Sequence, residues 1–179
     1  MVICIIIVSQ VNMNPKIIIV DENDNIIAHK ERENLNAEDI YRVSALWVAN
    51  SKGEILLARR ALTKSHSPGK WGPAAAGTVE EGEDYYSNII KEAKEELGLE
   101  NIKPKTGPKI RVAKNYNYFC QWYLLEIDKP LNEFKIQKSE VEELKWISKK
   151  ELLDEIKNNP DDFVESMKES VKLLTKKII

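Results

Sequence analysis

The sequence predicts an α+β protein, and three features of the chain lead to that class. Short stretches rich in β-branched and aromatic residues lie before and after one long amphipathic segment. Two further amphipathic segments close the chain. The 179 residues contain neither an internal repeat nor a Ser/Gly linker, and they are enough for one core. We therefore expect one domain over residues 16–179, with strands on both sides of a central helix and helices at the end.

Residues 1–15 are expected to form an N-terminal extension or an extra strand. The apolar run VICIIIV is far shorter than the ~20 residues that span a bilayer, and no basic stretch or small-residue cleavage site accompanies it. Met13 opens a second start, because the sequence after it reads as a complete strand, turn and strand. We hypothesise that the native chain begins at Met13, although an edge strand explains residues 1–12 equally well. The mass of the endogenous protein distinguishes the two.

Seven segments have the composition expected of strands: 16–20, 26–28, 41–49, 54–60, 109–113, 118–127 and 143–147. The turn sequence Asn-Ser-Lys-Gly at 50–53 joins the third and fourth segments as a hairpin. The stretch 62–73 contains two prolines and two glycines and is expected to be a loop.

The helices are expected in the second half of the chain. A central helix covers 84–97, and Gly98 follows it as a residue suited to the left-handed conformation that ends helices. Ser148 and Glu151 match a capping box that begins a short helix, which Pro160 ends. The last helix carries an apolar stripe, most simply read as core packing, of residues three or four positions apart: Phe163, Met167, Val171, Leu174 and Ile178.

The composition is that of an ordinary globular protein, with 42% hydrophobic and 31% charged residues. Its net charge of −2 lacks the basic surplus of a nucleic-acid binder, although a local basic pocket for an anionic ligand remains compatible with it. Cys4 and Cys120 form neither a CxxC pair nor a disulfide framework. We expect a cytoplasmic protein with no membrane or nucleic-acid partner.

Three carboxylates share one face of the central helix, because Glu92, Glu95 and Glu96 are three and four positions apart. Like charges at this spacing repel, and a hard divalent cation held by oxygen ligands would compensate them. Gly77, which precedes the helix, would allow the backbone to approach a metal or a phosphate closely. A solvated acidic face explains the helix by itself equally simply, since charged runs usually face water.

The spacing of the residues in and before this helix indicates a protein family more specifically than the charge of the helix does. Residues 77–99, GTVEEGEDYYSNIIKEAKEELGL, closely resemble the Nudix box, G-x5-E-x7-R-E-U-x-E-E-x-G-U, where U is a bulky apolar residue. Two positions depart from it: Lys91 stands in place of Arg, and Ala93 is small. The resemblance extends over about 16–153, including LLARRA, PGKWGPAAAG and EVEELKWIS, and is greatest to the branch related to isopentenyl-diphosphate isomerase.

This resemblance implies the Nudix fold, a mixed β-sheet sandwiched between α-helices with C-terminal helices. It implies hydrolysis of a diphosphate linkage in a nucleoside diphosphate derivative or a related small molecule, with Mg²⁺, or Mn²⁺, as cofactor. The metal ligands carried over are the carbonyl of Gly77 and three side chains: Glu92, Glu95 and Glu96. Glu83 would be accessory, as a structural hydrogen-bond acceptor or an outer-shell group. Lys91 supplies charge without the two-pronged geometry of Arg, so we expect it to orient a neighbouring Glu less firmly.

The general base is left open by the sequence. The box offers Glu95 or Glu96, whereas a later acidic group offers Glu140, Glu142 or Glu143, which is also explained as an exposed charge cluster.

Substrate phosphate is expected to meet one of two arginines, Arg59 and Arg60, which point to opposite faces of their strand. Lys70 is a weaker candidate in the following loop. Among the aromatic residues, Trp47 and Trp71 are expected to be partly buried, and Tyr116 and Tyr118 are expected to share a face, in the core or beside a flat ligand group. His29 and His66 are expected on the surface, and Cys120 inside.

Two other functions were weighed. An isopentenyl-diphosphate isomerase needs a Cys in the loop after the tryptophan, where this chain reads WGPAAAG, and it needs histidines about where Asn34 and Tyr41 stand. No carboxylate lies between Glu100 and Glu126, where the isomerase has its second catalytic Glu. A catalytically silent ligand sensor would not need the full set of carboxylates. A hydrolase acting on a small-molecule diphosphate therefore fits best, and a homodimer is left open.

Overall fold

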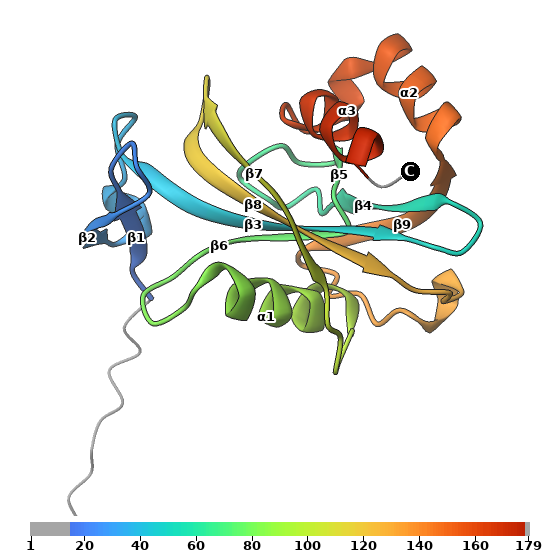
Figure 1. Ribbon diagram of the computed structural model, residues 1–179, viewed down its shortest axis with the longest axis horizontal. Helices are drawn as coiled ribbons and strands as arrows, with labels where there is room; N and C mark the ends of the chain where they lie inside the picture. The colour runs from blue at the N-terminus through green and yellow to red at the C-terminus, as the bar shows by residue number, and fades with distance from the viewer. Residues whose placement is uncertain (1–14, 178–179) are drawn as a thin grey trace, which may run out of the picture.

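A computed structural model of the chain describes residues 15–177 (Figure 1). Within this range nine strands and three α-helices follow one another. They are β1 (Ile17–Val20), β2 (Ile26–Lys30), β3 (Ile40–Ala49), β4 (Glu54–Arg60), β5 (Trp71–Gly72), β6 (Ala75–Thr78), α1 (Tyr85–Leu97), β7 (Lys105–Ala113), β8 (Asn117–Glu126), β9 (Val141–Ser148), α2 (Lys149–Asn158) and α3 (Met167–Lys177). Cys4, Met13 and Ile178 lie outside the described residues, and so do the expectations that concern them.

Strand β3 is the centre of the mixed sheet. On one side β8 pairs with it in parallel from Tyr41↔Tyr118 to Ala49↔Glu126, and β7 continues the sheet beyond β8. The other side of β3 is shared by three antiparallel partners, β1, β6 and β4. Strand β4 separates from β3 after two residue pairs and continues between β5 and β9. This separation leaves room for β6 beside the middle of β3.

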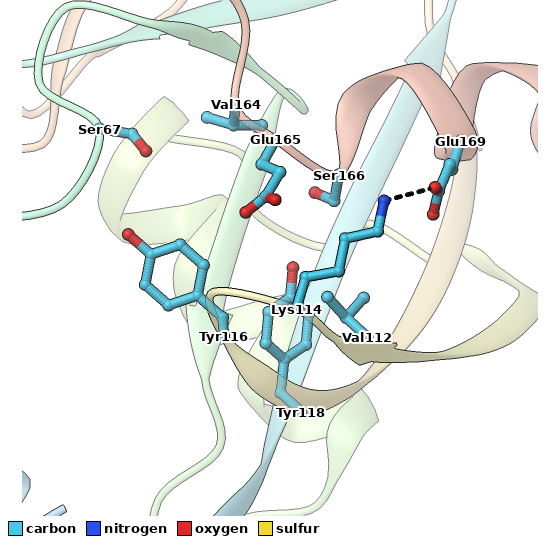
Figure 2. Close-up of a pocket in the computed structure, with 9 residues that line it drawn as sticks. All are labelled: Ser67, Val112, Lys114, Tyr116, Tyr118, Val164, Glu165, Ser166 and Glu169. Carbon is cyan, nitrogen blue, oxygen red and sulfur yellow. Dashed lines mark hydrogen bonds and ion pairs between the residues drawn. The ribbon is translucent and has the colours of Figure 1, made fainter. Parts of the chain in front are cut away.

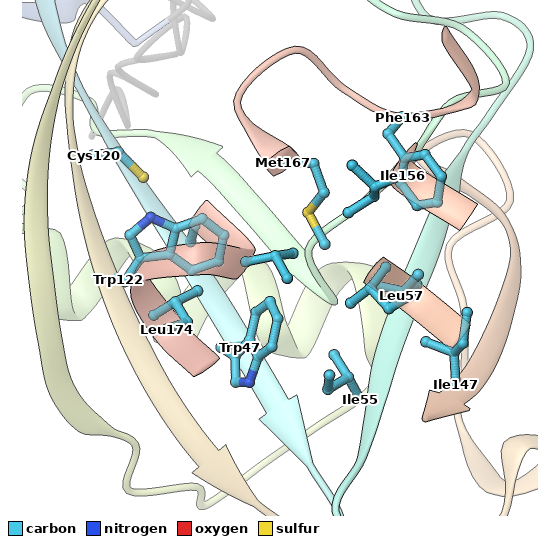
Figure 3. Packing of buried hydrophobic residues seen from close by; sticks show 13 residues of the cluster. Trp47, Ile55, Leu57, Cys120, Trp122, Ile147, Ile156, Phe163, Met167 and Leu174 are labelled. Atoms are coloured by element: carbon cyan, nitrogen blue, oxygen red, sulfur yellow. The ribbon is translucent and has the colours of Figure 1, made fainter. Parts of the chain in front are cut away.

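Helices cover both faces of the sheet, as the α+β sandwich requires (Figure 1). Helix α1 packs Ile89, Ala93 and Leu97 against Leu46 and Val48, among other residues of one face. On the opposite face, α2 and α3 enclose a larger cluster around two edge-to-face tryptophans (Figure 3): Trp47, Trp122, Leu57, Ile147, Ile156, Phe163, Met167 and Leu174. The predicted fold class is confirmed.

The ends of the central helix have the expected chemistry. Asp84 and Ser87 form a reciprocal capping box at the start of α1. Gly98 ends the helix with φ of 66°, and its N–H donates to the carbonyls of Ala93 and Lys94. A side chain at position 98 would also collide with Lys135, so the backbone geometry and the packing both call for glycine there.

Several boundaries differ from those predicted. The stretch expected to be a loop ends in strand β5, and β6 lies in the small-residue segment that follows it. These short strands exist because they pair with β4 and β3, which local sequence does not reveal. Strand β7 begins at Lys105 rather than at 109. A register shift between Thr106 and Lys109 accommodates Gly107 and Pro108 within the strand. Strand β9 likewise begins at Val141, two residues early.

The expectations about single side chains are mostly met. Cys120 is buried, and both histidines, His29 and His66, are exposed. Trp71 is half-buried, but the prediction for Trp47 was wrong, because only 3% of it is exposed at the sheet–helix interface. Among residues 15–177, no helix is both long and apolar enough to cross a bilayer.

Candidate active site

The acidic face of α1 lies against β6, and its three carboxylates differ sharply in exposure. Glu96 is buried, with 8% of it exposed, whereas Glu92 is half-buried and Glu95 is exposed. The helical spacing brings the three carboxylates to one side of α1, but α1 packs on the sheet in such a way that one edge of this acidic face is buried. Two carboxylates are thereby held away from water and one is left in it.

Glu96 is the most deeply placed of the three. The N–H of Ala76 on β6 donates to its Oε2 at 3.2 Å. Burial, followed by repulsion from Glu92, raises the pKa of Glu96 to about 8, although the Ala76 hydrogen bond and the charge of Arg60 oppose this shift. In a protein without a bound cation, Glu96 therefore holds a proton near neutral pH.

Glu92 lies directly over Gly77. A Cβ at position 77 would overlap the carboxylate of Glu92, so the glycine makes room for this side chain. Burial raises the pKa of Glu92 to about 7, with Lys91 opposing the shift and the charge of Glu95 adding to it. The prediction was that Gly77 lets the backbone approach a metal or a phosphate; the group that lies against it in the structure is the Glu92 carboxylate.

Lys91 joins the loop before α1 to the helix. Its Nζ lies 2.6 Å from Glu83 Oε1, 3.0 Å from Glu80 Oε2 and 3.9 Å from Glu92 Oε1. Burial opposes the shift, but the hydrogen bonds to Glu83 and Glu80 raise the pKa of Lys91. Burial opposes a lowered pKa at Glu83 as well, but the hydrogen bonds that it accepts from Lys91, the Glu80 N–H and the Asn88 amide lower its pKa. Glu83 accepts hydrogen bonds from all three of these groups.

Sequence reasoning missed three participants: Ser44, Glu80 and Asn88. Asn88 is fully buried in α1, where its amide meets Ser44 of β3, the carbonyl of Thr78 and the carboxylates of Glu83 and Glu92. Its position four residues before Glu92, on the same helical face, was a signal that could have found it. The roles of Ser44 and Glu80 depend on chain pairing and loop shape, for which the sequence carries no such signal.

The two arginines of β4 do point to different sides. Leu56 of β4 packs in the α1-side cluster and Leu57 in the opposite one, so alternation along the strand puts Arg60 on the α1 side of the sheet. Its charge there acts on Glu96, and its Nε donates to the carbonyl of His66. Arg59 lies over the ring of Trp71 on the other side and pairs with Glu143 at 2.9 Å. Arg60 is therefore the arginine of the pair that faces the acidic helix.

The later acidic group is divided in the same way. Glu140 lies in the turn before β9, and its charge contributes to the raised pKa of Glu96. Gln137 of that turn donates to the Glu96 carbonyl. Glu140 also pairs with Lys64 at 2.5 Å. Glu142 is exposed on β9 and Glu143 pairs with Arg59, whereas Glu140 is the member of the group whose charge acts on Glu96.

A separate groove lies on the α2–α3 side, between the β7–β8 turn and the start of α3 (Figure 2). Tyr116 and Tyr118 both line it, as their alternation predicts, with a Lys114–Glu169 ion pair of 2.8 Å at its far end. Lys70 borders the adjoining hollow of about 580 Å³ rather than the acidic helix.

The carboxylates of α1 are ligands of the kind that a hard divalent cation prefers, although their side chains do not converge on one metal position. Among residues 15–177, no three His, Cys, Asp or Glu side chains are grouped closely enough to hold a metal ion. The fit lies in the chemistry of the buried Glu96 and the half-buried Glu92, whose negative charges are costly until a cation compensates them. The residues present therefore fit Mg²⁺ or Mn²⁺.

An α/β/α sandwich whose central helix holds carboxylates against a glycine-containing strand defines a hydrolase of the Nudix class. The family model for the NUDIX domain matches residues 40–170, more than half of the chain. The chain belongs to the Nudix hydrolase family.

Curated relatives agree with this assignment. An uncharacterised Nudix hydrolase of Yersinia pestis is 29% identical over 141 residues, which cover 75% of this chain and 73% of the relative. The Nudix hydrolase YfcD of Escherichia coli (strain K12) is 31% identical over 137 residues, covering 75% and 74%. An isopentenyl-diphosphate Delta-isomerase of Photorhabdus laumondii is 27% identical over 154 residues, covering 81% and 86%.

Solved structures share the fold. DR0079 from Deinococcus radiodurans superposes with a TM-score of 0.78 at 23% identity, covering 88% of this chain and 97% of that one. The NUDIX domain of Shewanella oneidensis NrtR, solved with ADP ribose, has a TM-score of 0.61 at 13% identity, covering 83% and 94%. A Francisella tularensis NMN adenylyltransferase/ADP ribose pyrophosphatase, solved with AMP and a Mn ion, has a TM-score of 0.59 at 19% identity, covering 76% and 41%.

Proposed function

We propose that this Nudix hydrolase uses Mg²⁺ to split a diphosphate linkage in a nucleoside diphosphate derivative or a related small molecule. One observation carries the proposal: the buried Glu96 and the half-buried Glu92 lie beside β6, and burial together with repulsion from neighbouring carboxylates raises both pKa values. Such a pair is costly as it stands and is stabilised by a divalent cation, which is also what a diphosphate requires for attack. Residues 16–179 would act as one domain.

The class of substrate rests on the neighbours of the fold. Two of them are solved with ADP ribose or with AMP and a Mn ion, and their ligands share a nucleotide. Arg60 supports this choice, because it brings a fixed positive charge to the side of the sheet that carries the acidic helix. The groove beside Tyr116 lies on the other side and is not needed for the phosphate end.

Each residue of the site has a proposed part in the reaction. Glu92, Glu95 and Glu96, with the Gly77 carbonyl, would hold the cation, which neutralises the diphosphate and makes a bound water more acidic. Arg60 would orient a phosphate oxygen. Glu83 and Lys91 would keep the start of α1 in place through their 2.6 Å contact.

Hydrolysis would proceed by in-line attack of water on phosphorus. A P–O bond forms as the bridging P–O bond breaks, and a carboxylate takes the proton of the water. Glu140, near Glu96, and the exposed Glu95 are the candidates for that base.

The test is phosphate release from a panel of nucleoside diphosphates, nucleoside triphosphates and sugar-linked diphosphates, with Mg²⁺ and with chelator. We expect release only with the cation and expect E95Q combined with E96Q to abolish it. A matched double variant, E126Q with E133Q, alters two carboxylates outside the site and should keep full activity. Release that persists in the E95Q/E96Q protein, or in chelator, would contradict the assignment.

The similarity to an isomerase does not change this proposal. The loop WGPAAAG contains no thiol, and no carboxylate occurs between Glu100 and Glu126 to serve as the second acid of an isomerase. Double-bond migration in isopentenyl diphosphate is therefore expected to be absent. Tight nucleotide binding without turnover by the intact protein would instead indicate a ligand sensor.

A further inference from the structure

Asn88 is a polar side chain in the apolar interface between α1 and the sheet. It is 0% exposed, and the next residue, Ile89, is equally buried in the core. Burying an amide is costly unless its hydrogen-bonding groups are satisfied, so an alanine would fill this position more cheaply. The contribution of Asn88 must then lie in the groups that it touches.

The surroundings of Asn88 determine which way its amide faces. Three oxygen acceptors lie on the nitrogen side: the Thr78 carbonyl at 3.2 Å, Glu83 Oε2 at 2.8 Å and Glu92 Oε1 at 3.4 Å. An oxygen placed there would face three others, so this position belongs to the NH₂ group. On the opposite side, the buried Ser44 hydroxyl donates to the Asn88 Oδ1 and fixes the amide in this orientation.

Asn88 and Lys91 act on the same two carboxylates. They bind different oxygens of Glu83, Oε1 to Lys91 at 2.6 Å and Oε2 to Asn88 at 2.8 Å, and Oε2 also accepts the Glu80 N–H at 3.1 Å. Both donors also approach Glu92 Oε1, Asn88 at 3.4 Å and Lys91 at 3.9 Å. The Asn88 amide and the Lys91 ammonium thus provide two donors in different directions. A guanidinium also provides two such donors, whereas the point charge of a lysine alone does not.

We propose that Asn88 is a positioning residue: with Lys91 it forms a two-donor clamp that holds Glu83 and aims the Glu92 carboxylate. The inference rests on the proposed function, because it assigns Glu92 to the cation. The clamp explains how Glu92 is oriented over Gly77 in a chain that has lysine at position 91. Without the amide, Glu83 would lose its Oε2 partner from α1, and Glu92 would lose the nearer of its two donors.

The test measures Mn²⁺ affinity without substrate, by electron paramagnetic resonance of the free ion, beside Mg²⁺-dependent phosphate release. We expect N88A to weaken Mn²⁺ binding by about ten-fold or more, as loss of a residue that orients a ligand does. The combined variant N88A/K91R should regain most of this affinity, because the guanidinium replaces both donors. The control I89V removes a methylene from the neighbouring core position, so it tests for a general loss of packing, and it should leave Mn²⁺ affinity unchanged.

An N88A protein that binds Mn²⁺ as tightly as I89V, or that K91R does not rescue, would overturn the proposal. Should N88A fail to fold, S44A carries the test, since it removes only the hydroxyl that fixes the amide. S44A should weaken Mn²⁺ binding by about three-fold or more, and unchanged affinity would overturn the clamp. A wild-type protein that binds Mn²⁺ but releases no phosphate would refute the proposed function. The Mn²⁺ affinities of the variants would then still decide whether the clamp exists.

Discussion

Replacing Glu96 with glutamine should stabilise the cation-free protein at alkaline pH. The pKa of Glu96 rises from 4.5 to about 8 in the fold, mainly because the side chain is buried. The fold therefore binds a proton that the unfolded chain releases, and stability falls as pH rises from about 4.5 to about 8. Glutamine keeps the shape and the oxygen that accepts the Ala76 N–H, and it carries no charge at any pH.

The magnitude follows from the same shift. A pKa difference of this size corresponds to about 5 kcal/mol. Because the glutamine amide is itself buried, at a cost of about 1–3 kcal/mol, we expect roughly 2 kcal/mol to be regained by E96Q at pH 8. For a chain of this length that is about 4–8 °C in Tm. Below pH 4.5 the carboxyl is neutral in both states, so the advantage of E96Q should disappear.

Thermal unfolding followed by circular dichroism between pH 4.5 and 8.5, in chelator, measures this difference. The exposed substitution E126Q is the control and should change Tm equally at every pH. Adding Mg²⁺ at pH 8 should raise the Tm of the wild type more than that of E96Q. A Tm difference between E96Q and wild type that is constant across this range, or a less stable E96Q protein at pH 8, would refute the reasoning.

Two further predictions concern neighbouring residues. G77A should lower kcat by about ten-fold or more, because the new Cβ occupies the place of the Glu92 carboxylate. It should lower Tm less than a core truncation does. A kcat equal to that of the wild type would show that Glu92 has another usable position. R60A should lower kcat/KM by about ten-fold, which is the value of one charged hydrogen bond. R59A is on the opposite side of the sheet and should change kcat/KM by less than about two-fold. Equal losses in the two variants would show that the side of the sheet does not determine which arginine contributes to catalysis.

Much of the site follows from local rules. The positions of Glu92, Glu95 and Glu96 on one helical face depend only on the 3.6-residue period, and the ends of the helix depend on Asp84 and Gly98. The alternation of β4 likewise separates Arg59 from Arg60 without reference to the rest of the chain. Each of these relations spans fewer than about five residues, so the backbone geometry of one element determines it.

Other parts of the site are non-local. Strand β5 is only two residues long and β6 consists of small residues, and both exist because they pair with β4 and β3. The Asn88 amide meets Ser44, which is distant in sequence, and Arg60 rather than Arg59 faces α1 because of the side of the sheet on which α1 packs. No pattern within a single element contains this information.

By itself the sequence determined the class of the fold, the acidic helix with its caps, and the spacing that relates it to the Nudix family. Only the tertiary structure decided that Glu96 is buried, Glu92 half-buried and Glu95 exposed, although all three are equally acidic in sequence. The physical reason is that helical periodicity sets angles about the axis of α1, whereas contact with β3 and β6 sets how that axis is rotated against the sheet. That rotation decides which carboxylates lose water, and therefore which of them have raised pKa values.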